Sequence, residues 1–105
     1  MEKQTRLVGT EIKLNVHMEP IGDVHMSMCP FSMYVYAVSG KGYEIKKEEC
    51  ILVDSDNYIV VVDTSKTGEG VIRLRYTVDL PDADISDGFR REIILIDTGI
   101  QIRRA

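Results

Sequence analysis

Apolar and polar side chains alternate along several short segments of the chain, which is typical of β-strands that bury one face. The clearest segment spans residues 71–80, and residues 11–18 show the same period of two. We expect two inward-facing rows, formed by Ile72, Leu74, Tyr76, Val78 and Leu80 in the first segment and by Ile12, Leu14, Val16 and Met18 in the second. The side chains between these positions are mostly charged or polar and are expected to face the solvent.

Further segments are rich in β-branched and aromatic residues and are also predicted to be strands. They span residues 31–38, 43–47, 50–53, 58–63 and 91–102. Segment 58–63 is apolar on both faces, which favours a central position in a sheet. In the last segment, one row is formed by Ile94, Ile96, Ile100 and Ile102.

Residues typical of turns separate the predicted strands. They are found at Pro20 and Gly22, at residues 39–42 and at residues 54–57. The longer connection at 64–70 begins after Asp63, which is placed to cap one helical turn that Gly68 would end. About seven short strands without a helical segment of useful length favour an all-β fold.

The strand pattern predicts an antiparallel, immunoglobulin-like β-sandwich, with a small barrel as the alternative. The chain has 105 residues, which is enough for one domain and too few for two. We therefore expect a single β-sandwich domain over residues 1–105.

Composition and charge exclude several classes of function. A hydrophobic fraction of 44% indicates a globular core and argues against disorder. The formal charge of −4 disfavours nucleic acid as a partner, because binding to it normally requires a basic surface. Residues 1–13 contain no apolar run, so neither a signal peptide nor a membrane span is expected there, and we expect a cytoplasmic protein.

Residues 17–33 gather soft and borderline metal ligands, which raises the question of a copper site. They comprise His17, Met18, His25, Met26, Met28, Cys29 and Met33. A blue-copper site on a β-sandwich needs a histidine between its cysteine and its methionine, and no histidine follows Cys29 here. We therefore expect the methionines to fill the core, Cys29 and Cys50 to be reduced thiols, and no metal or cofactor to be bound.

Residues 81–88 place three aspartates in one predicted loop. Asp82, Asp84 and Asp87 do not have the spacing of an EF-hand, because the glycine is one position late and no glutamate closes the loop. A looser calcium site in this loop is an alternative. We favour a turn between two strands, in which the aspartates accept backbone hydrogen bonds and Asp87-Gly88 supplies a positive φ.

No arrangement of residues indicates a catalytic site, so we expect a protein that is not an enzyme. There is no GxSxG or Walker A motif, and no sequence motif joins either cysteine to a histidine. We expect a protein contact surface instead, and its candidate residues are Arg73, Arg75, Asp82, Asp84, Asp87, Arg90 and Arg91. Tyr34 and Tyr36 share a face and are candidates for a small platform that stacks against a sugar.

Several turn motifs in the second half of the chain resemble those of a known group of phage proteins. They are Asp63-Thr64-Ser65, Gly68 with Gly70, Pro81-Asp82-Ala83-Asp84, Asp87-Gly88 and Asp97-Thr98-Gly99-Ile100. This half is similar to small phage and prophage proteins of gut Bacteroides-type bacteria. It also resembles the amino-terminal immunoglobulin-like module of phage baseplate and tail-fibre proteins of the upper-baseplate type.

The resemblance implies a structural or assembly module of a phage or prophage virion, in its baseplate or tail. Such a module forms homo-oligomers or contacts other tail components, and it lies in the host cytoplasm before it joins the virion. The alternative function is a small module that binds carbohydrate or calcium. Neither function requires nucleic acid or a membrane as a partner.

Overall fold

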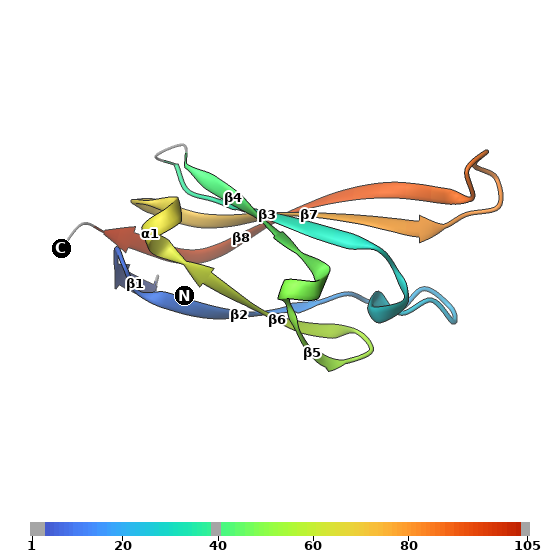
Figure 1. Cartoon of the computed structure of the whole chain (residues 1–105), viewed down its shortest axis with the longest axis horizontal. Helices are drawn as coiled ribbons and strands as arrows, with labels where there is room; N and C mark the ends of the chain where they lie inside the picture. The colour runs from blue at the N-terminus through green and yellow to red at the C-terminus, as the bar shows by residue number, and fades with distance from the viewer. Residues whose placement is uncertain (1–3, 39–40, 104–105) are drawn as a thin grey trace.

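The computed structural model describes residues 4–38 and 41–103, which form two β-sheets and three short helical turns (Figure 1). The larger sheet has the order β1 (Gln4–Leu7), β8 (Phe89–Arg103), β7 (Gly70–Pro81), β3 (Phe31–Tyr36) and β4 (Gly42–Lys46). The smaller sheet has the order β2 (Glu11–His17), β6 (Asn57–Asp63) and β5 (Ile51–Asp54). The helical turns are η1 (Met26–Met28), η2 (Lys47–Glu49) and α1 (Thr64–Thr67).

The prediction of an all-β fold is confirmed, and each predicted strand has a counterpart within a few residues. Strand β6 is central in its sheet, as its two apolar faces indicate. Asp63 caps α1 by accepting a hydrogen bond from the Ser65 backbone N–H (3.0 Å), and Gly68 ends the turn with φ of 72°. The turn predicted at residues 39–42 lies partly outside the described residues, since these omit 39 and 40.

One strand pair departs from the predicted antiparallel arrangement. β1 runs parallel to β8, with Thr5 opposite Gln101, so the larger sheet is mixed. The residues of β1 have no alternating pattern that would mark them as a strand. Backbone hydrogen bonds hold this segment, including one from the Val8 N–H to the Arg103 carbonyl (2.9 Å).

The two layers meet across the predicted inward-facing rows. Every residue of the β7 row is buried, and in the row Ile12–Met18 only Leu14 is partly exposed. Because β7 lies between β8 and β3 in the larger sheet, its side chains reach the core from the centre of that layer. Aromatic rings also pack in the core, where the ring of Phe31 meets the ring of Tyr58 edge-on with 5.0 Å between their centroids.

A bulge in β8 keeps Ile96, Ile100 and Ile102 on the inward-facing side, whereas Ile94 of the predicted row is 41% exposed. Arg73 lies opposite Asp97 and Val71 lies opposite Gln101, so β8 advances four residues (97 to 101) while β7 spans two (73 to 71). Two extra residues keep the alternation of faces, because side chains repeat with a period of two. The Thr98 hydroxyl fixes the bulge by donating to the Ile72 carbonyl (2.7 Å).

The two sheets differ in length, and this gives the molecule its elongated shape of 50 × 27 × 25 Å. β7 and β8 contain 12 and 15 residues, whereas β2 and β6 contain seven each. The hairpin formed by β7 and β8 therefore extends past the strands of the smaller sheet (Figure 1). Among the described residues, no helix is long and apolar enough to cross a bilayer.

We expect Ile72→Ala to lower the free energy of unfolding by about 2–5 kcal/mol, because it removes a fully buried side chain and leaves a cavity. The matched control is Ile93→Ala in the paired strand, where the side chain is exposed and the change should stay within about 0.5 kcal/mol. Urea denaturation measures both values. Equal losses in the two variants would contradict the assignment of inner and outer faces.

Candidate functional site

The projecting hairpin carries most of the predicted contact residues at its tip. The strands pair as far as Pro81 and Phe89, and residues 82–88 turn between them. Asp82 accepts a hydrogen bond from the Asp84 N–H (3.0 Å), and Asp87 accepts one from the Phe89 N–H (3.1 Å). Gly88 has φ of 83°, as the turn interpretation predicts.

Ion pairs flank this turn on both faces of the hairpin. On one face, Arg90 contacts Asp82 (3.3 Å) and Glu92 (3.1 Å). On the other face, Arg91 contacts Asp79 (3.2 Å), which is its partner across the strands. The arginines of these pairs are exposed and their acidic partners are partly exposed, so each pair contributes little to folding stability and the arginines remain accessible to a partner protein.

The other two predicted contact residues lie on the same sheet but away from the tip. Arg73 pairs with Asp97 at 3.6 Å. Arg75 places its guanidinium over the ring of Tyr34, 5.1 Å from the ring centroid. Tyr34 also stacks on Tyr36 at 6.0 Å, so the predicted aromatic pair exists, but an arginine already covers one of its rings.

The hairpin also exposes apolar side chains that the sequence interpretation did not single out. Phe89, Ile93 and Leu95 lie on the outer face of β8, and their exposed fractions are 44%, 60% and 69%. A hollow of about 330 Å³ adjoins Phe89, between Asp79, Asp87 and Arg91. The signal for this face was the run Ile93–Ile96, because four consecutive apolar residues in a strand place apolar groups on both of its faces.

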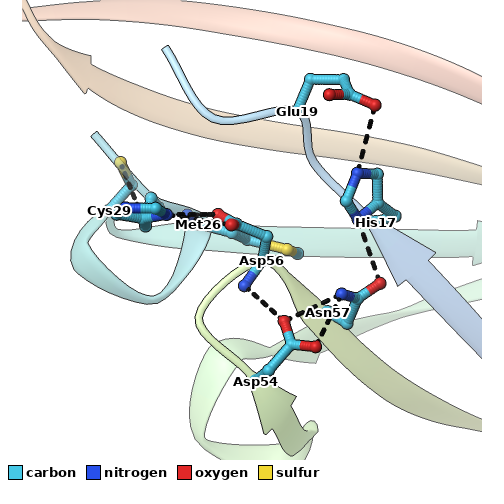
Figure 2. Close-up of polar contacts among 8 residues, drawn as sticks. His17, Glu19, Met26, Cys29, Asp54, Asp56 and Asn57 are labelled. Atoms are coloured by element: carbon cyan, nitrogen blue, oxygen red, sulfur yellow. Dashed lines mark hydrogen bonds and ion pairs between the residues drawn. The ribbon is translucent and has the colours of Figure 1, made fainter. Parts of the chain in front are cut away.

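A second cluster of polar groups anchors the segment between β2 and β3 (Figure 2). The Asp56 carboxylate contacts His25 Nδ1 (2.9 Å) and accepts a hydrogen bond from the Met26 N–H (3.1 Å). Lys47 donates from Nζ to the carbonyls of Ser27 (2.8 Å) and Cys29 (2.9 Å). These contacts join residues that are 18 to 31 positions apart in sequence, so no local pattern indicates them.

The anchoring cluster holds soft side chains in the core. Met26 and Cys29 are fully buried, Met18 and Met33 are nearly so, and Met28 is exposed. This confirms the core-filling role predicted for most of the methionines. Among residues 4–38 and 41–103, no group of three or more His, Cys, Asp or Glu side chains is arranged to hold a metal ion.

Both cysteines are free thiols in the described structure, as predicted. Burial raises the pKa of Cys29, and burial together with Glu49 and Glu48 raises the pKa of Cys50 to about 11. Both thiols are therefore protonated at neutral pH, which makes them poor nucleophiles.

His17 lies on the exposed face of β2 and contacts two acceptors. Its Nδ1 is 3.0 Å from the Asn57 side-chain oxygen, and its Nε2 is 3.3 Å from Glu19 (Figure 2). The hydrogen bond to Asn57, followed by the contact with Glu19, raises the pKa of His17. The charged imidazolium is favoured because both ring nitrogens then donate.

Comparison of the chain with protein-family models, with curated proteins and with solved structures found no match. The exposed hairpin and the anchoring cluster are therefore the features from which a function can be inferred. The hairpin presents accessible charged and apolar groups. The anchoring cluster uses its polar groups internally, so it serves the fold.

We expect Asp56→Asn to destabilise the fold at neutral pH, because the amide replaces a carboxylate that binds His25 and the Met26 N–H. The hydrogen bond from His25 lowers the pKa of Asp56 in the folded state. The contribution of the ionised Asp56 carboxylate to folding stability is therefore complete above the ordinary aspartate pKa of about 4. It is lost as the pH falls through the lower folded-state pKa. Urea midpoints measured from neutral to acidic pH should show the two proteins converging in acid.

The control for this measurement is Asp84→Asn, since Asp84 is exposed in the hairpin turn. It should leave the urea midpoint near that of the unchanged protein at every pH. A gap between Asp56→Asn and the unchanged protein that stays constant into acid would contradict the role given to the ionised carboxylate.

Proposed function

We propose that the chain is a non-enzymatic assembly module that contacts other protein subunits through the outer face of its β7–β8 hairpin. The observation that carries this proposal is the exposure of Phe89, Ile93 and Leu95 on one face of a projecting hairpin. Contiguous apolar groups on a protein surface are typical of a protein–protein contact. Arg91 and Asp79 lie among them and supply a polar component, as interfaces usually require.

The resemblance of the turn motifs to phage proteins supports a more specific role. In that role the module is a baseplate or tail subunit of a phage or prophage, with an immunoglobulin-like arrangement of its strands. Its partners are other tail components, and it moves from the host cytoplasm into the virion. A subunit of this kind requires surfaces for assembly and no reactive group, which agrees with protonated thiols and internally paired acids.

The geometry of the hairpin suits a contact between subunits. β7 and β8 pair over 12 and 15 residues, so the apolar face lies on a regular hydrogen-bonded ladder. A rigid strand pair loses little conformational entropy on binding, because its backbone is already ordered. The tip adds charges of both signs from Asp82, Asp87, Arg90 and Arg91, which can orient a partner.

The direct test is co-purification of the chain with the products of its flanking genes, followed by size exclusion with light scattering. We expect a stable complex with a tail component. The double variant Ile93→Lys/Leu95→Lys should abolish that complex, because it places two charges at the centre of the proposed interface. Thermal melting should show that the variant still folds, since both side chains are exposed.

The matched control is Leu52→Lys/Val53→Lys in β5, which alters two equally apolar and exposed side chains on the other sheet. This control should retain the complex. The proposal fails if none of the flanking gene products binds the chain, or if the β5 variant and the β8 variant weaken binding equally.

A further inference from the structure

On one side of the molecule, each sheet has a strand with one edge open along most or all of its length in the described residues. β2 is the edge of the smaller sheet, and in the larger sheet the described residues of β1 pair with residues 100–103 of β8. A groove of about 370 Å³ opens between β2 and β8. Its lining consists of Leu14, Asn15, Val16, His17, Leu74, Ile96 and Thr98.

The backbone of β2 presents hydrogen-bonding groups along this open edge. Thr64 N–H bonds to the Thr10 carbonyl (3.4 Å) and Met18 N–H bonds to the Asp56 carbonyl (3.0 Å), so the even-numbered residues of this segment face β6. In an antiparallel ladder the intervening residues direct their N–H and C=O groups to the opposite side. The groups that face outward therefore belong to Glu11, Lys13, Asn15 and His17.

We propose that this edge binds β2 of a second copy in antiparallel register, so that the smaller sheets of two chains form one continuous sheet across a two-fold axis. The register that pairs the whole strand places Glu11 opposite His17 of the second copy and Lys13 opposite Asn15. All four of these residues have outward-facing backbone groups, so each such pair can exchange both of its hydrogen bonds. The inference is independent of the hairpin contact proposed above.

Charge complementarity selects this register over its neighbours. A shift of two residues in one direction would place Lys13 opposite Lys13 of the second copy. A shift in the other direction would place Lys13 opposite His17, whose charged form is favoured by Asn57 and Glu19. Only the full-length register sets an acid against the imidazolium, and the two-fold axis repeats that pair. Opposite charges across a strand pair stabilise it, and like charges destabilise it.

The apolar face of the strand favours the same register. Leu14 lies at the axis and would meet Leu14 of the second copy, and Ile12 would lie opposite Val16. Leu14 is the one residue of its inward-facing row that is only partly buried, and it lines the groove with Leu74 and Ile96. A second copy would therefore cover apolar surface that a single chain leaves open.

The experiment is light scattering over a concentration series with variants of the β2 edge. We expect a concentration-dependent dimer of the unchanged chain. Asn15→Pro should abolish it, because proline removes an outward-facing N–H and leaves the ladder to β6 intact. Asn15→Thr is the matched control, since it keeps the N–H and the strand propensity, and it should retain the dimer.

A charge exchange provides a second test that does not depend on proline. Glu11→Lys and His17→Glu should each weaken the dimer by about fivefold or more, because each change places like charges opposite one another at both symmetry-related pairs. The double variant Glu11→Lys/His17→Glu should recover most of the affinity. Recovery would exclude a folding defect as the cause of the single-variant losses.

Three results with the unchanged chain and the β2 variants would overturn the proposal. They are a chain that stays monomeric at every concentration, a dimer that tolerates Asn15→Pro, and single charge variants that the double variant does not rescue. A dimer lost only in Ile93→Lys/Leu95→Lys would also overturn it, by assigning self-association to the hairpin. A monomer that still binds a tail component through the hairpin would leave the proposed function standing while this inference fails.

Discussion

The structure depends on packing a short, three-stranded layer against a longer, five-stranded one. The inward-facing row of β7 is the main contribution of the larger sheet to the core, since each of its five side chains is buried. The smaller sheet has two strands of only seven residues, so it covers part of β7 and leaves much of β8 uncovered. The projecting hairpin and the groove beside β2 both result from this mismatch in size.

The parts of the fold that follow from local pattern could be predicted from the sequence. The rows Ile12–Met18 and Ile72–Leu80 alternate cleanly, because one face of each strand is buried and the other is solvated. The helical turn after Asp63 was also predictable, since an N-capping carboxylate and a terminating glycine act within a few residues of each other. The turn role of Asp82 and Asp87 follows from the same kind of short-range hydrogen bond.

The parts that depend on tertiary contacts could not be predicted in this way. β1 has no alternation of its own and becomes a strand because β8 offers it an edge. Asp56 was missed because His25 and Met26, which it binds, are about thirty residues away in the chain. The outer face of β8 was missed for a different reason. Its apolar run fits a strand buried on both faces, and the local pattern does not reveal that, among the described residues, no second layer covers the face of β8 that points away from the core.

The segment between β2 and β3 shows how polar contacts can serve an apolar core. Met26 and Cys29 fill the core near Phe31 and Tyr58, yet their own segment has little regular structure to hold it in place. Asp56 and Lys47 supply that restraint from the β5–β6 hairpin and from η2. The concentration of His, Met and Cys that suggests a copper site in the sequence is thereby explained by packing and anchoring.

The two proposed contact surfaces differ in chemistry, and their geometry makes them compatible. The β2 edge offers backbone hydrogen bonds, whereas the outer face of the hairpin offers apolar side chains whose backbone is already paired with β7. The hairpin tip lies beyond the His17 end of β2 (Figure 1). A two-fold axis through Leu14 reverses the second copy, so the two hairpins would project in opposite directions. Pairing through β2 would therefore turn a module with one contact face into a connector with a contact face at each end.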